Sequence, residues 1–213
     1  MAGSGIPRRH RRDDVADVAL RILDEHGLAD LTMRRIAAAL DVQPSALYWH
    51  FENKQTLIAE LADRIVDGHP APASAISTAG SDWQERTRVE ASALRDALLS
   101  YRDGAEIVSS TYALGLGSGR ALSRLTDAVA LGGFDQATSR RAGTTLLHFV
   151  LGHVSHEQQR LQYDSVGVLA EVLEAQPLGA DDQAQAFAFG VGLLVDGLSL
   201  ARLSGRPADR SRA

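Results

Sequence analysis

Residues 32–54 of the chain read TMRRIAAALDVQPSALYWHFENK, the pattern of two short helices joined by a tight turn. Apolar side chains recur at helical spacing in the first half, and Thr32 stands where an N-cap is expected. Residues 41–43 interrupt this pattern. Pro44 can open a second helix, over residues 44–51, because its missing amide hydrogen would have no partner there. The stretch therefore predicts a helix-turn-helix.

The second helix of this motif carries a cluster of aromatic side chains. Because successive residues of a helix are about 100° apart, Leu47 and Phe51 share one face. Tyr48, Trp49 and His50 must then point elsewhere, and so short a helix cannot bury them all. Exposed aromatic side chains of this kind indicate a contact surface. The alternative is that they form an ordinary core cluster.

Around these side chains, residues 31–61 resemble the DNA-binding segment of the tetracycline-repressor (TetR) family of transcriptional regulators. The shared features are a leucine–tyrosine pair, a histidine–aromatic pair and a lysine four residues after the histidine. The resemblance implies that the second helix enters the major groove, that the tyrosine and histidine bind phosphates, and that the lysine contacts the DNA backbone. The DNA-binding set implied by the resemblance is Thr32, Arg34, Gln43, Pro44, Ser45, Ala46, Tyr48, Trp49, His50 and Lys54.

Two positions in this segment depart from the family pattern. Asp41 stands where relatives usually have glycine, and aspartate tolerates a left-handed turn better than most residues. We therefore expect the turn to form. Ala46 stands where a hydroxyl side chain is frequent, so one contact to phosphate or base is expected to be missing.

The composition is that of a globular protein. The chain has 213 residues, 45% of them hydrophobic and 23% charged, which suits one or two domains. The absence of cysteine excludes disulfides, iron–sulfur clusters and thiolate zinc sites. The start of the chain is polar and basic, unlike a signal peptide, and the longest apolar run, residues 187–203, is shorter than the ~20 residues that span a bilayer. We expect a cytoplasmic protein with no membrane contact.

The net charge of −5 is unusual for a protein that binds nucleic acid. The distribution of cations matters more than their sum. Arg8, Arg9, Arg11 and Arg12 form an arm without acidic residues, and the single lysine of the chain is Lys54, in the motif. The arm is interpreted either as a DNA contact or as a solvated tail.

The apolar periodicity predicts helices throughout, so we expect an all-α fold. By the resemblance, residues 8–55 form a three-helix DNA-binding domain with the helix-turn-helix, and residues 56–205 a larger helical domain for ligand binding and dimerisation. Residues 68–81 read as a loop, and residues 105–114 as either a strand or a short helix. The helices expected outside the motif cover residues 13–26, 54–67, 83–101, 120–131, 135–163, 166–175 and the stretch from 181 or 182 onwards.

The last helix is apolar nearly all round, which indicates neighbours on both sides. We expect it to form a four-helix bundle between two subunits of a homodimer, together with the helix at residues 135–163. A central helix within a monomer is the alternative. The side chains with the spacing of an interhelical seam are Phe187, Val191, Leu194, Leu198 and Ala201.

The second half of the chain also resembles the tetracycline repressors, over residues 97–112 and 146–160. The effector in those proteins is a tetracycline–magnesium complex. Val108 and His156 stand at the positions matching the metal-binding histidine and glutamate, so we expect no metal and no cofactor. A small, largely apolar or aromatic effector is predicted instead. The expected ligand contacts are Leu94, Val108, Thr111, Tyr112, Leu146, His148, Phe149 and His156.

Three function classes remain open. The favoured one is a repressor that binds a palindromic operator on double-stranded DNA and is released by a small effector. The second is a dimeric DNA-binding regulator without an effector. The third is a metal-dependent enzyme that uses His153, His156 and Glu157, but a third convergent ligand is missing, so we expect no enzymatic activity.

Overall fold

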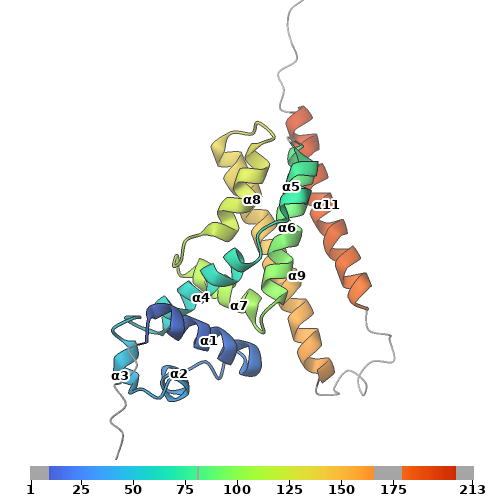
Figure 1. Ribbon diagram of the computed structural model, residues 1–213. Helices are drawn as coiled ribbons and strands as arrows, with labels where there is room; N and C mark the ends of the chain where they lie inside the picture. Colours follow the sequence, from blue (N-terminus) through green and yellow to red (C-terminus); the bar gives the residue numbers. More distant parts are fainter. Residues whose placement is uncertain (1–9, 81, 166–178, 205–213) are drawn as a thin grey trace, which may run out of the picture.

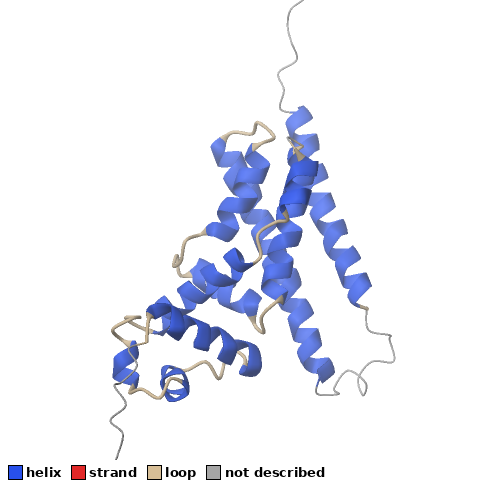
Figure 2. Ribbon diagram, viewed as in Figure 1, coloured by secondary structure: helices blue, strands red, loops and turns tan. Residues whose placement is uncertain are grey.

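The computed structural model describes residues 10–80, 82–165 and 179–204, and the regular structure in these ranges is α-helical (Figure 1, Figure 2). The expected all-α fold is confirmed. Figure 1 shows a small group of N-terminal helices joined by α4 to a larger group of longer helices. The helix expected at residues 166–175 lies outside the described residues, as do Arg8 and Arg9.

The N-terminal group consists of α1 (Arg12–His26), α2 (Met33–Ala39) and α3 (Pro44–Leu47), and α4 (Lys54–Gly68) follows directly. Asn53 begins α4 with a reciprocal capping box, in which its side chain accepts from the Thr56 amide at 2.9 Å. The large side chains that are fully buried in this group are Leu23, Leu31, Ile36, Leu47, Phe51 and Leu57.

Helix α5 (Ala73–Ala79) lies where we expected only a loop, so the expectation for residues 68–81 is wrong in part. The segment has no apolar periodicity, but three of its seven residues are alanine, the residue with the highest helix propensity. Ala79 is buried, and α5 packs against the following helix, α6. This packing stabilises a helix that is too short to form alone.

The larger group consists of α6 (Trp83–Leu99), α7 (Gly104–Ala113), α8 (Arg120–Ala130), α9 (Gln136–Ser165) and α11 (Ala180–Ser204). The stretch that read as either strand or helix is the helix α7. Asp82 caps α6 by accepting from the amides of Gln84 and Glu85. Helix α6 packs against α8, α9 and α11 and so forms the centre of the body.

Helix α11 turns a different face to its own domain than the apolar spacing indicated. Phe187 and Val191, which we expected in a dimer seam, are buried in the core of this one chain. Phe189, Leu193 and Leu200 are instead 69%, 59% and 65% exposed. The spacing misled because, on a helix that is apolar nearly all round, no single stripe stands out as the inward one.

The other seam positions are less buried: Leu194 and Leu198 are half-buried, and Ala201 is exposed. The stretch Asp181–Arg202 is long and apolar enough to cross a membrane by length and composition, which corrects the expectation that the apolar run is too short. Only 17% of its most apolar window is buried within the chain. Length and composition do not distinguish a membrane span from a helix that another protein surface covers.

Gly143 sets how closely α9 approaches α8. A Cβ atom at this position would lie 2.4 Å from Thr126 Oγ1 and 3.0 Å from the Thr126 backbone nitrogen. Gly143→Ala should therefore force the helices apart and lower the free energy of unfolding by about 1–3 kcal/mol. Gly192→Ala is the control, because Gly192 is also helical and nothing lies within 4 Å of its added methyl group. Denaturant unfolding measures both, and equal losses would contradict this account of the packing.

Candidate functional site

The turn between α2 and α3 depends on Asp41, whose φ is 54°. This left-handed conformation is unfavourable for most residues but is tolerated by aspartate, so the prediction that the turn forms without glycine is confirmed. Thr32 caps α2 as expected, and its hydroxyl oxygen accepts from the Arg35 amide at 3.2 Å. The Val42 amide donates to the Ala37 carbonyl at 3.0 Å and closes the turn.

Helix α3 is shorter than expected, because it ends at Leu47 and residues 48–50 form a turn. The amides of His50 and Phe51 both donate to the Leu47 carbonyl, at 2.9 and 3.0 Å, which tightens the chain there. Leu47 and Phe51 are buried, whereas Tyr48 is 53% and Trp49 90% exposed. The predicted division between core and contact side chains is confirmed, and the alternative of a core aromatic cluster is wrong.

The other expected DNA contacts surround these aromatic side chains. Thr32, Arg34, Gln43 and Ser45 are exposed, and Pro44, Ala46, His50 and Lys54 are half-buried. Within the described residues Arg34 forms no ion pair, while its neighbour Arg35 pairs with Asp30 at 2.9 Å. The guanidinium of Arg34 is thus free to bind a base edge or a phosphate. The DNA contacts themselves stay predictions.

Ion pairs between α1 and α4 hold the motif in place, and the sequence pattern did not indicate them. Arg64 on α4 donates to Asp13 and Asp17 on α1, to the latter at 2.9 Å. It also donates to Glu60, which accepts a second hydrogen bond from Arg12. Burial alone would raise the pKa of Glu60, but the hydrogen bonds from Arg64 and Arg12 lower it below its ordinary value. The lowered pKa stabilises this contact at neutral pH, and the stabilisation is lost as acid protonates the carboxylate.

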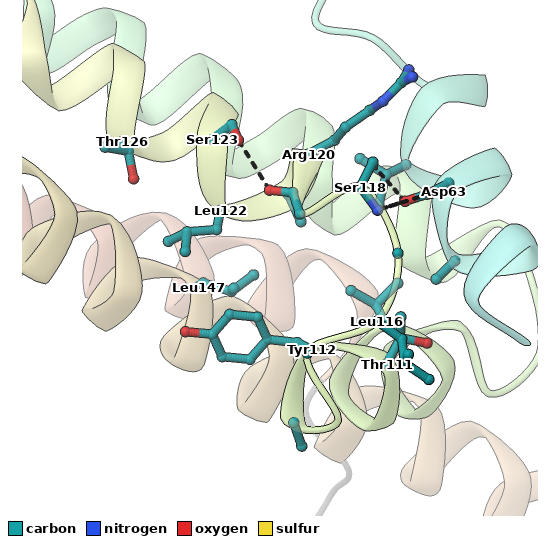
Figure 3. A pocket seen from close by; sticks show the side chains of 18 of the residues that line it. Asp63, Thr111, Tyr112, Leu116, Ser118, Arg120, Leu122, Ser123, Thr126 and Leu147 are labelled. Atoms are coloured by element: carbon teal, nitrogen blue, oxygen red, sulfur yellow. Dashed lines mark hydrogen bonds between the residues drawn. The ribbon is translucent and has the colours of Figure 1, made fainter. Parts of the chain in front are cut away.

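A cavity of about 690 Å³ lies between α4, α7, α8 and α9, beside the loop at residues 114–119 (Figure 3). Its volume is in the range of small-molecule sites in proteins. Figure 3 shows the side chains of Tyr112, Leu122 and Leu147 gathered on one side. Apolar side chains of Val66 and Val108 also line it. Polar and charged side chains, among them Asp127 and Arg140, line it as well, so the cavity offers a guest both apolar and polar contacts.

Only part of the expected ligand set lines this cavity, namely Val108, Thr111 and Tyr112. Leu94 is fully buried in the core and lines neither this cavity nor the other described grooves. Leu146 lines a separate groove of about 290 Å³ against α11, and its neighbour Leu147 takes the expected place in the cavity.

His148, Phe149 and His156 line a further groove, of about 570 Å³, between α9 and α11. The reason is geometric, because consecutive residues of α9 point about 100° apart and residues 146–149 cannot all face one cavity. The resemblance assigned ligand contacts to positions in the sequence, but it did not indicate in which direction each side chain points from the helix. The part of these residues in ligand binding stays a prediction.

The loop beside the cavity is fastened to α4. Ser118 donates to the Asp63 carboxylate from its amide at 3.0 Å and from its hydroxyl at 2.6 Å (Figure 3). Arg120, which also lines the cavity, forms an ion pair with Asp67 on the next turn of α4. These contacts were not evident in the sequence, because the partners are more than fifty residues apart.

The C-terminal end of α4 is held by Arg124 of α8. Its Nη1 atom donates to the carbonyls of Val66 at 3.1 Å and His69 at 3.4 Å, which have no partner within the helix. Its Nε atom donates to the buried carboxylate of Glu90 at 2.9 Å, and Arg86 donates to the same carboxylate at 3.1 Å. The end of α4 is thus joined to α6 and α8.

The residues considered for a metal site are arranged differently. Both carboxylate oxygens of Glu157 accept from Arg95 of α6, at 2.6 and 3.1 Å. The His153 ring packs against the rings of Phe149 and Phe187, with centroids 5.7 and 5.3 Å away, and these two rings also stack on each other. Within the described ranges, no three His, Asp or Glu side chains are placed to hold one metal ion.

An exposed helix-turn-helix, joined by one helix to a body with a ligand-sized cavity, defines a class: DNA-binding regulators that respond to a small molecule. Comparison with known proteins identifies the family. Residues 15–61 match the bacterial regulatory proteins of the tetR family, and residues 77–171 match the tetracyclin repressor-like C-terminal domain. The chain belongs to the TetR family of transcriptional regulators.

The relatives span nearly the whole chain. Tetracycline repressor protein class E of Escherichia coli is 34% identical over 195 residues, which cover 88% of this chain and 90% of the repressor. The crystal structure of Mycobacterium smegmatis BioQ is 41% identical, with a TM-score of 0.77, and the match covers 90% of this chain and 98% of that one. A BioQ crystallised with its natural double-stranded DNA operator is 39% identical, with a TM-score of 0.71, and covers 89% and 98% of the two chains.

Arg34 and Lys54 should contribute to DNA binding in different ways. Arg34→Ala is expected to cost about 1–3 kcal/mol of operator binding and to relax the preference at one guanine. Lys54→Ala should weaken binding to all sequences alike and lower the salt slope by about one ion. Arg35→Ala is the control, because Arg35 is paired with Asp30. Binding to pooled sequences at several salt concentrations measures both effects, and the same loss of preference in both variants would contradict the assignment.

Proposed function

We propose that the protein is a transcriptional repressor that binds a palindromic operator as a homodimer and leaves it when a small, largely apolar or aromatic effector enters the cavity beside α4. The observation that carries the proposal is the direct attachment of the cavity's loop to α4. Helix α4 begins at Lys54, next to the exposed side chains of the DNA-binding motif. A DNA-binding regulator of this kind acts in the cytoplasm.

The exposed face of α11 supports the homodimer. Phe189, Leu193 and Leu200 would leave a large apolar area in water if nothing covered them. Asp181 and Asp182 in the first turn of the helix are exposed, and its Asp196 forms an ion pair with Arg88 of α6 at 3.2 Å. A second copy covers such a face symmetrically, and two copies present two reading motifs to a palindrome about one DNA turn, ~34 Å, apart.

The cavity walls support an apolar effector without a metal. Val108 offers only dispersion and hydrophobic contact at the place where the resemblance puts a metal-binding histidine. Asp63 and Arg120, two of the charged residues around the cavity, are already engaged with Ser118 and Asp67. Asp127 and Arg140, the other charged residues of the lining, form no ion pair among the described residues, so a guest would combine apolar surface that leaves water with polar contacts to these two side chains.

Release from DNA requires that the effector favour one position of α4 over another, because a ligand shifts an equilibrium only by its differential affinity. The segment from Ser118 to Arg124 borders the cavity. It also contacts α4 at three points, through Ser118, Arg120 and Arg124. A guest that displaces this segment moves α4, and with it the spacing of the two reading motifs. A regulator without an effector would not need this arrangement.

Tetracycline tests the predicted effector chemistry. With Val108 in place of an imidazole ligand, neither tetracycline alone nor tetracycline with magnesium should release the protein from its operator. Titration of the protein–operator complex, followed by fluorescence anisotropy of labelled DNA, measures this. Magnesium-dependent release at micromolar drug would show that the interpretation of Val108 is wrong.

A panel of apolar and aromatic compounds, screened for operator release, separates an effector-controlled repressor from a regulator without an effector. For a compound that releases the wild-type protein, Ser118→Ala should weaken the release about tenfold and leave binding of the compound nearly unchanged, because the hydroxyl contact with Asp63 is lost. Ser123→Ala is the control, since Ser123 lines the same cavity but bonds only to Gly119 of its own segment. Equal effects of the two variants would contradict the coupling through Ser118.

A further inference from the structure

Three of the chain's seven histidines lie along one groove of α9 that the proposed DNA and effector sites do not use. This groove, of about 570 Å³, runs between α9 and α11 and is lined by His148, His153, His156 and Arg160. Gln183 faces them from α11. The four cationic or titratable side chains form what we call the histidine face.

The histidine face is continuous with the exposed apolar face of α11. The groove at its other end, of about 290 Å³, is lined by Leu146 of α9 and by Leu193 of α11, one of the exposed apolar side chains. Residues 142, 146, 149, 153, 156 and 160 of α9 line the two grooves and recur every three or four residues, the spacing of one helix face. The surface that a second copy is proposed to cover therefore includes these histidines.

Among the described residues the imidazoles have no acidic partner, since no carboxylate oxygen lies within 4 Å of a nitrogen of any of the three rings, and Arg160 forms no ion pair there. The Nε2 atom of His153 is buried and makes no hydrogen bond. Protonation of these rings would thus add positive charge beside a guanidinium without a counter-charge.

The charged groups on the surrounding elements do not change this balance. Glu157 of α9 is occupied by Arg95 of α6. Glu106 of α7 shares a neighbouring groove with His148 but forms no ion pair with it. Asp181 and Asp182 stand at the exposed start of α11, and Arg141 of α9 adds a further cation. No carboxylate lines the histidine face itself.

We propose that dimerisation through α9 and α11 is sensitive to protons, because a second copy covers neutral imidazoles at lower cost than imidazolium ions, whose charge adds to that of Arg160 on the same face. This inference rests on the homodimer of the proposed function. Imidazole is the side chain that changes charge between about pH 5 and pH 8. Since the dimer disfavours the charged form, it is most stable in the upper part of this range and loses stability as the pH falls through it.

Symmetry determines the steepness of the effect. In a two-fold interface each histidine occurs twice, so protons are taken up in pairs when the dimer dissociates. With one proton per protomer, the logarithm of the dimer dissociation constant rises by about two for each unit of pH over which the protons are taken up. Protonation of His50 in the DNA-binding motif would instead strengthen DNA binding, because a charged imidazole binds phosphate better. The measurement is therefore made without DNA.

Sedimentation equilibrium of the full chain, from about pH 8 to about pH 5.5, measures the dimer dissociation constant across the range in which imidazole titrates. We expect a dimer at the upper limit and a constant roughly a hundredfold weaker at the lower one. The double variant His148→Gln, His156→Gln should reduce this change to less than about tenfold, because glutamine keeps the polar contacts but takes up no proton. His26→Gln on α1, remote from the face, should behave like the wild type. Circular dichroism at each pH establishes that the helices remain folded.

The outcomes separate this inference from the proposed function. A monomer at about pH 8 would overturn the proposed homodimer and the inference with it. A dimer whose dissociation constant is unchanged at about pH 5.5 would overturn the inference and leave the homodimer intact. The same pH dependence in the wild type and the double variant would also overturn it, since the protons would then bind elsewhere.

Discussion

Helix α4 is the element on which the other parts depend, because ion pairs and hydrogen bonds join it both to α1 and to the larger group of helices. Arg64 ties it to Asp13 and Asp17 of α1, next to the DNA-binding motif. Arg124 of α8 satisfies the carbonyls that its last turn leaves open. A helix of 15 residues is roughly 22 Å long, and its hydrogen-bond ladder resists bending. A displacement at one end is therefore carried to the other.

Buried carboxylates make the body behave as one unit. Glu90 and Glu157 are both buried, and each is neutralised by guanidinium groups from another helix. A buried charge without its partner is costly, so these pairs join α6 to α8 and to α9 in one arrangement. The glycine-containing loop at residues 114–119 has no such buried pair among the described residues and is held by exposed contacts to α4 and by backbone hydrogen bonds to the end of α7. The cavity thus borders a segment that is not fixed by a buried ion pair.

The sequence was most informative where structure depends on neighbours in the chain. The cap at Thr32 and the left-handed turn at Asp41 are local hydrogen-bond and backbone effects, and both are as expected. The caps at Asn53 and Asp82 are effects of the same kind. The outward direction of Tyr48 and Trp49 follows from helix geometry once Leu47 is assigned to the core. Such features depend on contacts within four or five residues, which a linear pattern contains.

The sequence by itself determined the helical class, the DNA-binding motif with its exposed aromatic side chains, and the family. The tertiary structure alone decided that α5 is a helix, that Phe187 and Val191 face inward, and that Leu147 rather than Leu146 lines the cavity. It also decided the contacts of Asp63 with Ser118 and of Glu157 with Arg95. These features depend on which surfaces meet when distant segments pack. When a helix is apolar all round, its sequence does not indicate which of its faces will be buried.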